Sequence, residues 1–496
     1  MSVSLRPAPV FSDHMVLCRN KNIRIFGEAE NGSTVTVSIN DHTASCRAVK
    51  GYFRAVLPPM PHGGPYTMTV TDGESVLTFS DILIGDVYFA GGQSNMEMQL
   101  KDTQDGERYA AEADYPEIRY CNYPVQPYLD QKALQWERKT KWRVVRPGAC
   151  GDISAVAFHF AVRLHASLNV PVGIIDCYLG GTSITSWLDE GALRATTGGA
   201  EYLDAFLGRI KDQTDEEYQK ACNAQQRCHA VWSRGADAIL AKNPSAKWED
   251  FIAELGPCPW PPPEGRKSAY RPCGLVNTMV KRIAPYTLTG FLYYQGESDY
   301  LHPQLYRALM MSLIASWRDL FLAPSLPFLF VQLPMFAQRD DTTGNSWAVL
   351  RHAQEQTYRD MRNTGIAVMI DGGDEEDIHP QDKITVGERL YQQAMEVVYR
   401  QPEENSPRAT AARPDGCVMM VTVSAPLRHE KTPRLFELAG EDGIFYPAEA
   451  VINGTAVRVF SEAVSHPRFI RYAWVNYAKV NVFGENGLPL APFCLR

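Results

Sequence analysis

The chain has 496 residues, which is long enough for two or three domains around at least one large hydrophobic core. The formal net charge is −8 and lysine and arginine form no block, so a nucleic-acid partner is disfavoured because phosphate binding needs clustered basic side chains. No apolar run approaches the roughly 20 residues that span a bilayer, and the first residues lack a secretory signal pattern, so we expect a cytoplasmic protein with no membrane partner.

Residues 1–85 are predicted to form an N-terminal β-rich domain. The segment 34–39 alternates apolar and polar side chains, which is the period of a half-buried strand. The pairs Asn31-Gly32 and Asp72-Gly73 are turn dipeptides between such runs. Short strands with regular turns predict a small β-sandwich.

Residues 86–404 alternate short apolar runs with helical patterns. Apolar residues recur every four positions in 305–317 and again in 386–398, as in amphipathic helices. Buried strands that alternate with such helices predict a parallel sheet covered on both faces. The expected strands are 86–90, 172–177, 291–294, 328–333 and 366–370.

Residues 190–270 interrupt this alternation with a polar, mostly helical stretch that ends in a proline-rich run around Trp260. We interpret it as an insertion over one edge of the domain, which either shapes a binding cleft or has no role. Residues 405–496 are again β-rich, with a hairpin expected at Asn453-Gly454. Both terminal segments are β-rich and they flank the central region. The sequence therefore leaves open whether they form one discontinuous domain.

Four polar loops follow predicted strands of the central region. The first contains Ser94 after two glycines, where a strand that turns sharply into a helix would expose the hydroxyl at the sheet edge. Ser94 could equally be only a helix N-cap. The second loop contains Gly181 and the third contains Gln295, which could both donate hydrogen bonds to an oxyanion.

The fourth loop, residues 371–380, is rich in acids and contains His379. A neighbouring carboxylate would hold the imidazole in one tautomer and stabilise its charged form. A calcium loop is the alternative, but the EF-hand pattern fails because Gly373 takes the third position and the central glycine is missing. Together the four loops supply a serine, oxyanion donors and a histidine, the groups needed for acyl transfer without a metal or organic cofactor.

The sequence resembles the sialate O-acetylesterase family of SGNH hydrolases nearly from end to end. The matching motifs are GQSNM at 92–96, GGT at 180–182 with Trp187, YQGES at 294–298, DIHP at 377–380 with Lys383, Gly387, Arg389 and Leu390, an opening segment at 11–17 and closing segments at 471–474 and 487–493. The resemblance implies an SGNH-type three-layer α/β/α domain with a central parallel sheet, flanked by β-rich segments.

The resemblance also implies roles for individual residues. Ser94 would be the nucleophile and His379 the general base and acid, while the backbone N–H groups of Ser94 and Gly181, with Gln295, would hold the oxyanion. The superfamily places an aspartate three residues before the histidine, but this sequence has Glu376 there and Asp377 two residues before. We favour Asp377 as the third member of a triad, with Glu376 or a Ser-His dyad as alternatives.

The expected function is therefore hydrolysis of acetyl esters on a sugar, with an acetylated sugar or oligosaccharide as the partner. The substrate is an O-acetylated sialic acid or, alternatively, an acetylated hemicellulose such as xylan, mannan or xyloglucan. A non-catalytic carbohydrate-binding protein and an esterase of lipid or peptide esters are the other hypotheses. No oligomeric state follows from the sequence.

Overall fold

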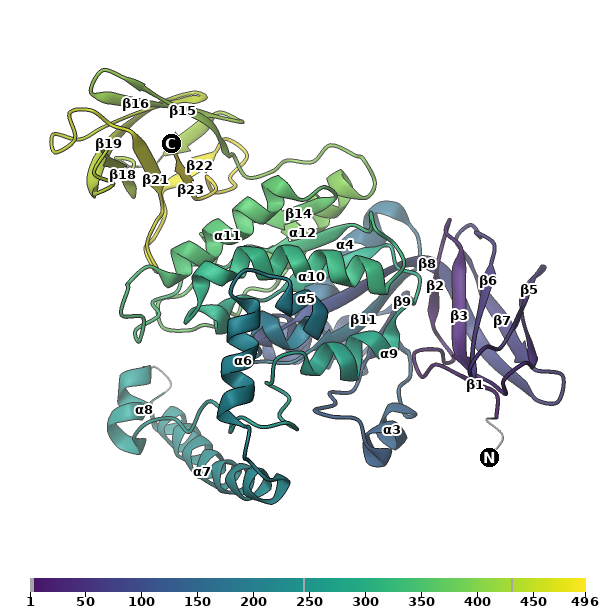
Figure 1. Cartoon of the computed structure of the whole chain (residues 1–496). Coiled ribbons are helices and arrows are strands. Elements are labelled where there is room, and N and C mark those ends of the chain that lie inside the picture. The colour runs from purple at the N-terminus through teal and green to yellow at the C-terminus, as the bar shows by residue number, and fades with distance from the viewer. Residues whose placement is uncertain (1–3, 244–245, 430) are drawn as a thin grey trace.

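The computed structural model describes residues 4–243, 246–429 and 431–496. The protein is of the mixed α/β class, as predicted. It has a β-rich region at the N-terminal end, a central region in which strands and helices alternate, and a second β-rich region at the C-terminal end (Figure 1).

The N-terminal region consists of short, mainly antiparallel strands. Their bounds are β1 Arg6–Pro7, β2 Val16–Cys18, β3 Ile23–Glu28, β4 Thr34–Ile39, β5 His42–Arg47, β6 Tyr52–Leu57 and β7 Gly63–Thr71. The strand expected from the alternating segment is confirmed as β4, whose side chains alternate between exposed or half-buried and buried. The turn at Asp72-Gly73 joins β7 to the antiparallel strand β8 (Val76–Gly92).

The strand β8 runs from this region into the central sheet, where it becomes fully buried. The other strands of the central sheet are β9 Tyr115–Asn122, β10 Arg143–Val145, β11 Val172–Tyr178, β12 Gly290–Tyr294, β13 Phe328–Val331 and β14 Thr364–Ala367. Their order is β10-β9-β11-β8-β12-β13-β14, and all neighbours pair in parallel except β10 with β9.

Helices surround this sheet. The α-helices are α1 Ser94–Glu97, α2 Gly106–Glu112, α3 Gln131–Glu137, α4 Ala155–Leu168, α5 Glu190–Arg194, α6 Gly199–Arg209, α7 Asp215–Lys242, α8 Trp248–Leu255, α9 Lys281–Ile283, α10 Tyr306–Leu320, α11 Ser346–Asp360 and α12 Ile384–Val397. The 3-10 helices are η1 Leu100–Asp102, η2 Ile184–Trp187, η4 Glu297–Asp299 and η5 Pro303–Leu305, and η3 Val276–Val280 is a π-helical turn. The two amphipathic patterns are confirmed as α10 and α12.

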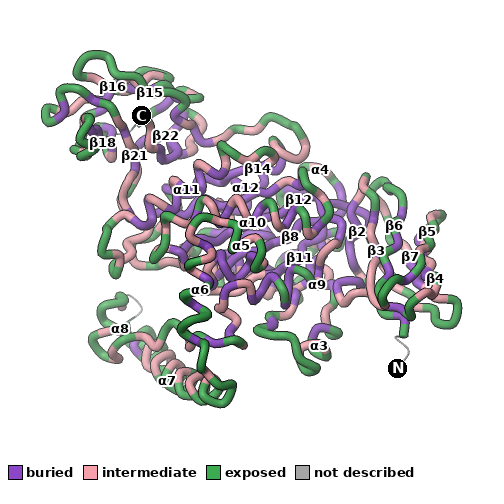
Figure 2. Tube along the Cα trace, in the orientation of Figure 1, coloured by how far each residue is buried: buried purple, intermediate pink, exposed green. Residues whose placement is uncertain are grey.

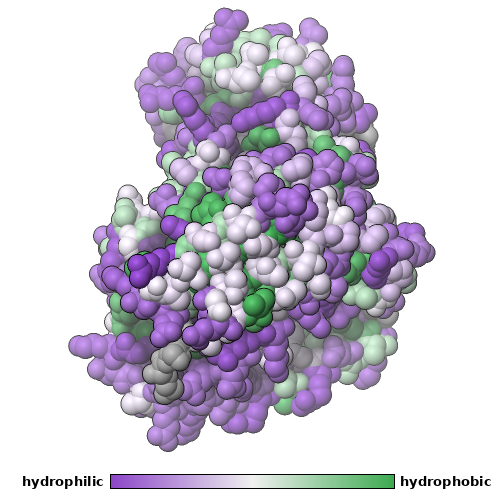
Figure 3. All heavy atoms as spheres, turned by 90° about the vertical axis from the view of Figure 1, so that its right-hand side faces the viewer, coloured by the Kyte–Doolittle hydropathy of each residue, from purple (hydrophilic) through white to green (hydrophobic). Residues whose placement is uncertain are grey.

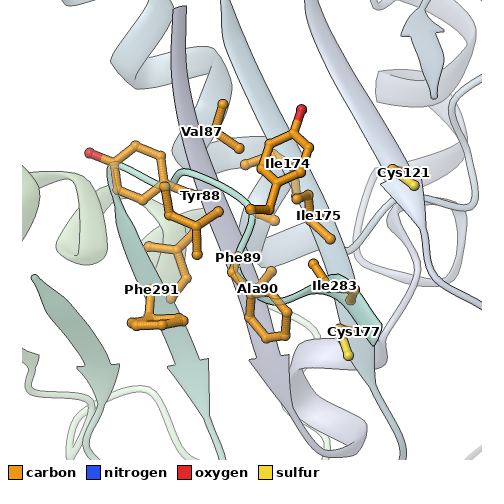
Figure 4. Close-up of a cluster of buried hydrophobic side chains, with 14 of the residues drawn as sticks. Val87, Tyr88, Phe89, Ala90, Cys121, Ile174, Ile175, Cys177, Ile283 and Phe291 are labelled. Atoms are coloured by element: carbon orange, nitrogen blue, oxygen red, sulfur yellow. The ribbon is translucent and has the colours of Figure 1, made fainter. Parts of the chain in front are cut away.

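Aromatic contacts show that helices cover both faces of the sheet. Successive side chains of a strand point to opposite faces. Tyr88 of β8 packs against Phe160 of α4, with ring centroids 4.8 Å apart, whereas the adjacent Phe89 packs against Trp317 of α10 at 5.3 Å. The helices α4 and α10 therefore lie on opposite faces, and the side chains of β8 and its neighbours fill the core between them (Figure 4).

The insertion is largely helical, as expected, and contains α6, α7 and α8. In Figure 1 the helices α7 and α8 project from the body of the protein, and Figure 2 shows them mostly half-buried or exposed. Ile239 is the single buried residue of α7 among those described. The proline-rich run that follows returns to the central region.

The C-terminal region forms a separate β unit with its own hydrophobic core. Its strands are β15 Ala409–Asp415, β16 Val418–Val423, β17 Leu427–His429, β18 Phe436–Ala439, β19 Phe445–Asn453, β20 Ala456–Phe460, β21 Phe469–Tyr472, β22 Val482–Gly484 and β23 Phe493–Leu495. The hairpin at Asn453-Gly454 is confirmed by the antiparallel pairing of β19 with β20.

The two β-rich regions are not joined into one discontinuous domain in this structure. They lie at opposite ends of the molecule (Figure 1), and in the described residues β15–β23 pair only with one another. The reason is that their apolar faces pack on different partners. The N-terminal strands share the core of the central sheet, whereas the C-terminal strands pack on a core that includes Met335, Val368 and Ile370.

One strand boundary differs from the expectation. The last central strand, expected at 366–370, is β14 (Thr364–Ala367), and Val368 and Ile370 pack in the C-terminal core instead of extending the sheet. All eleven cysteines lie in the described ranges and are free thiols. No described helix is both long and apolar enough to cross a membrane. On the face shown in Figure 3, apolar residues form small patches among hydrophilic ones.

Candidate active site

The carboxyl end of β8 lies at the point where the strand order of the central sheet reverses. Strands β9 and β11 lie on one side of β8, and β12, β13 and β14 lie on the other. Open α/β sheets bind ligands outside the carboxyl ends of their strands at such a point. Ser94, the first residue of α1, follows β8 after a single residue, so it lies at the edge where this fold favours a site.

Glycine is required where β8 turns into α1. Gly92 has a φ of +140°, and a Cβ atom there would lie 2.1 Å from the carbonyl oxygen of Tyr294. The next residue, Gln93, donates its backbone N–H to the same carbonyl at 3.0 Å. The turn is therefore held against the end of β12, and the position of Ser94 is fixed by backbone contacts.

The loop after β11 lies directly beside Ser94. A Cβ atom on Gly180 would lie 3.2 Å from the Cβ of Ser94, and the backbone N–H of Gly180 donates to the Glu97 carboxylate. Within the described ranges, Ser94 Oγ and the backbone N–H groups of Ser94 and Gly181 have no hydrogen-bond partner in the protein. These three groups are thus available to a ligand.

His379 lies in the loop between β14 and α12. The carbonyl of the preceding residue, Ile378, accepts a 2.9 Å hydrogen bond from Nδ2 of Asn95, which brings this loop beside the residue that follows Ser94. Burial lowers the pKa of the His379 imidazole below its usual value, although 42% of the side chain is exposed. In the described structure, no hydrogen bond joins His379 to Ser94 Oγ.

The two candidate carboxylates near His379 differ in their contacts. Asp377 Oδ1 accepts the backbone N–H of His379 at 2.7 Å and lies 4.0 Å from the imidazole Nδ1, which is beyond hydrogen-bond distance. Its charge raises the pKa of His379, opposing the effect of burial. Glu376 instead forms an ion pair with Arg339. Asp377 is thus the carboxylate that interacts with the imidazole.

The side chain of Gln295 is committed to contacts inside the protein. It is 1% exposed, and its Nε2 donates to Asp299 Oδ2 at 2.6 Å, to the Thr182 carbonyl at 3.1 Å and to Gln93 Oε1 at 3.2 Å. An amide nitrogen has only two protons. Gln295 could therefore act as an oxyanion donor only if some of these hydrogen bonds broke. As the structure stands, the Gln295 side chain connects the loops after β8, β11 and β12.

A buried polar network that the sequence did not reveal lies under the site. Asn95 is fully buried; its Nδ2 donates to Glu297 Oε1 at 2.6 Å, and its Oδ1 accepts from Lys383 Nζ at 2.7 Å. Lys383 Nζ also donates to the carbonyl of Pro380 at 2.6 Å. Because Asn95 binds the carbonyl before His379 and Lys383 binds the carbonyl after it, the network holds both sides of the histidine.

The ionisable members of this network are strongly perturbed. Burial raises the pKa of Glu297 to about 7 and lowers the pKa of Lys383 to about 8, because a charged group loses its hydration inside the protein. Glu297 Oε2 is buried without a partner in the described structure. Asn95 and Lys383 belong to the motifs quoted above, but no role could be predicted for either because their contacts join segments far apart in the chain.

The chain is similar to known carbohydrate esterases. Residues 264–396 match the family described as "Carbohydrate esterase, sialic acid-specific acetylesterase". The sialate O-acetylesterases of Mus musculus and Homo sapiens are 27% and 25% identical to this chain, over 80% of its length and 74% and 72% of theirs.

A solved structure covers the whole molecule. The crystal structure of a carbohydrate acetylesterase from Xanthomonas citri aligns with a TM-score of 0.78 and 28% identity, covering 99% of each chain. The family match, the curated relatives and this structure agree with the resemblance drawn from the motifs. The chain is thus similar to sialate O-acetylesterases over 80% of its length, and its residues 264–396 match the model of the sialic acid-specific acetylesterase family.

Proposed function

We propose that this protein hydrolyses O-acetyl esters of carbohydrates, with Ser94 as nucleophile and His379 as general base and acid. The observation that supports it most is the free hydroxyl of Ser94, which lies at the carboxyl end of β8 beside two free backbone N–H groups and the His379 loop. Similarity to sialate O-acetylesterases and to a carbohydrate acetylesterase supports the ester-hydrolase chemistry and the carbohydrate class of substrate.

The reaction would proceed through an acyl-enzyme. His379 accepts the hydroxyl proton of Ser94 while Oγ attacks the acetyl carbonyl, and the N–H groups of Ser94 and Gly181 hold the resulting oxyanion. The C–O bond to the sugar then breaks, and the sugar oxygen takes the proton from His379. Water, deprotonated by His379, attacks the acetyl-serine; the bond between the acyl carbon and Oγ then breaks, Oγ takes the proton back from His379, and acetate is released.

Asp377 is proposed as the acid that supports His379. It lies 4.0 Å from Nδ1 and can approach further when the imidazole becomes charged, because opposite charges attract. Glu376 is the weaker alternative because Arg339 occupies its carboxylate. Gln295 is proposed to position the loops around Ser94, and its action on the oxyanion remains a prediction.

The substrate is proposed to be an O-acetylated sialic acid, with acetylated xylan, mannan or xyloglucan as alternatives. Acetate release from a panel of these compounds distinguishes them. Release from none of them, together with preference for octanoate over acetate in simple esters, would instead indicate an esterase of lipids.

The variant Ser94→Ala tests the chemistry. We expect it to lower hydrolysis of a chromogenic acetate ester by at least about ten-thousandfold, since no other group replaces the nucleophile. The matched control is Ser75→Ala, an exposed serine of the N-terminal region, which should retain full activity. A folded Ser94→Ala protein with more than a few per cent of wild-type activity would reject the proposal.

The finer architecture is part of the same proposal. We assign the central sheet and its helices to the SGNH type of three-layer α/β/α domain, spanning residues 86–404 between β-rich regions at 1–85 and 405–496. We further propose a cytoplasmic location. Fractionation of cells that produce the untagged protein tests that location.

A further inference from the structure

Trp260 is an exposed aromatic residue that the insertion brings to the candidate active site. It lies in the proline-rich run after α8, and 47% of its surface is exposed. Large aromatic side chains are mostly buried in folded proteins, so an indole left in contact with solvent beside a site deserves explanation.

The indole lies directly on the loop that adjoins Ser94. A Cβ atom on Gly181 would be 2.3 Å from Cζ2 and 2.7 Å from Cη2 of Trp260, and no side chain could occupy that space. The preceding residue, Gly180, approaches Ser94 in the same way, with its Cβ position 3.2 Å from the Cβ of the serine. Two consecutive glycines therefore separate the indole from the proposed nucleophile.

Surrounding contacts hold the indole in this position. Tyr270 packs edge-on against it, with ring centroids 5.3 Å apart and planes at 89°. The side chain of Gln225 in α7 donates a 2.7 Å hydrogen bond to the carbonyl of Pro259. The backbone N–H of Trp260 donates to the carbonyl of Cys258 at 2.8 Å. Trp260 is thus partly exposed to solvent although these contacts hold its indole in place.

Trp260 also lines a cavity of about 230 Å³ against α7. The other lining residues are Gln225, Gln226, His229, Ala230 and Pro262. The cavity is smaller than the roughly 300 Å³ at which pockets for drug-sized ligands begin. It therefore suits a single ring, and its wall combines an aromatic surface with amide and imidazole groups.

A pyranose ring matches this combination. Its axial C–H groups form an apolar face that packs on an aromatic ring, while its equatorial hydroxyls need hydrogen-bond partners. Gln226 is exposed on α7 and His229 is half-buried, so both can reach such hydroxyls. A long acyl chain would use the indole but would leave these polar groups without a role.

We propose that Trp260 and the facing side of α7 form a sugar-binding subsite that orients the pyranose of an acetylated substrate toward Ser94. The proposal rests on the proposed function, since it assigns the sugar contact of that same site. It gives the insertion a role in choosing carbohydrate esters over simple ones.

The test compares two esters across three variants of the full chain. The first ester is ethyl acetate, which has no ring. The second is a sugar ester, chosen as whichever of O-acetylated N-acetylneuraminic acid and acetylated xylotriose the wild-type protein hydrolyses better. We expect Trp260→Ala to lower the ratio of kcat/KM for the sugar ester to kcat/KM for ethyl acetate by about tenfold or more, as for other aromatic binding hot spots. Trp260→Phe should restore part of the ratio.

The control is Trp248→Ala, which removes another exposed tryptophan of the same insertion. Trp248 is 45% exposed and packs against Trp232, away from the cavity lining. Its ratio should match the wild-type ratio. An unchanged ratio in Trp260→Ala, even with both rates reduced, would overturn the subsite and leave Trp260 as a support for the Gly181 loop.

A second measurement separates the subsite from the esterase proposal. If the wild-type protein hydrolysed neither ester, the proposed function would fail. Calorimetric titration of Trp248→Ala and Trp260→Ala with acetylated xylotriose and with O-acetylated N-acetylneuraminic acid would still show whether Trp260 contributes to sugar binding. Binding at least about tenfold weaker to Trp260→Ala supports it, and equal or absent binding to both variants rejects it.

Discussion

The hydroxyl of Ser94 has no hydrogen-bond partner among the described residues, and two glycines allow its close neighbours to approach. Gly92 lets β8 turn at a φ of +140°, and Gly180 lets the loop after β11 approach the serine. A side chain at either glycine would displace the hydroxyl from its neighbours. The chemistry of the site thus depends on residues that have no side chain.

The pH dependence of hydrolysis should report the ionisation of His379. Only the neutral imidazole accepts a proton, so activity is full above its pKa and is lost as the pH falls through it. Burial lowers this pKa, so we expect the acid inflection of kcat/KM below about 6.5, the usual histidine value. Asp377 raises the pKa, so Asp377→Asn should move the inflection to still lower pH.

The control for this profile is Glu375→Gln, an exposed acid of the same loop with no contact to the imidazole. It should leave the inflection in place. An inflection above pH 7 in the wild-type protein, or a shift to higher pH in Asp377→Asn, would contradict His379 as the base.

At the scale of elements, Asn95 joins α1 to the loops that begin at Glu297 and end at Lys383. It makes three hydrogen bonds of 2.6–2.9 Å while fully buried. Its ionisable partners Glu297 and Lys383 are also buried, with 3% and 1% of their surfaces exposed. A buried charge that loses its partner costs several kcal/mol, so this network favours one arrangement of the three segments.

The variant Asn95→Leu should therefore affect stability and activity together. We expect a loss of about 3 kcal/mol in the free energy of unfolding. In the protein that remains folded, kcat should fall by a larger factor than KM changes. The acid inflection of the kcat/KM profile should shift, because the His379 loop is no longer held. Urea unfolding and pH profiles measure both effects.

Asn122→Leu provides the comparison, because Asn122, the last residue of β9, donates its side-chain amide to the carbonyl of Asp152 and, among the described residues, makes no hydrogen bond with the His379 loop. It should leave the acid inflection unchanged. A stable Asn95→Leu protein with wild-type kcat and inflection would show that the network does not position His379.

The sequence predicted those elements whose signal is local. The alternation in β4, the period of four in α10 and the glycines before Ser94 are visible in neighbouring residues, and each was found where expected. Strand β9 was missed because Glu117 and Arg119 interrupt its apolar residues. Its place beside β11 depends on pairing with residues about 50 positions away.

The site was predictable only as a set of residues. The motifs identified the loops, but hydrogen bonds such as those of Gln295 and Asn95 join residues more than 100 positions apart. From the sequence, a buried Trp260 was a commoner explanation than one that stacks on a sugar. The structure leaves it 47% exposed, because its contact with Gly181 depends on how the whole insertion folds back. The contacts of these residues depend on long-range packing, which no local sequence pattern predicts.

At the scale of the whole molecule, the C-terminal β unit is attached through α11. Glu355 of α11 is 2% exposed and forms ion pairs with Arg359 on the same helix and with Arg408, which directly precedes β15. The Arg408 side chain is 15% exposed, so this pair is largely shielded from solvent. This pair connects the two regions, because removal of Glu355 would leave the largely buried Arg408 guanidinium without its carboxylate partner.

Glu355→Ala should loosen the C-terminal unit. We expect a loss of about 3 kcal/mol in the free energy of unfolding and faster proteolysis within residues 405–496. Glu388→Ala breaks an ion pair with Arg163 in which both side chains are about half exposed, and it should cost less than about 1 kcal/mol. Equal losses in the two variants would show that the Glu355 pair does not stabilise this attachment.

The role of Ser94 as nucleophile is tested most directly by locating the covalent adduct formed with a fluorophosphonate, which reacts with activated serine hydroxyls. We expect one adduct, on Ser94, found by mass spectrometry of the digested protein, with loss of activity in proportion to labelling. Labelling that is absent in active protein, or that falls on another serine while Ser94 remains free, would contradict it.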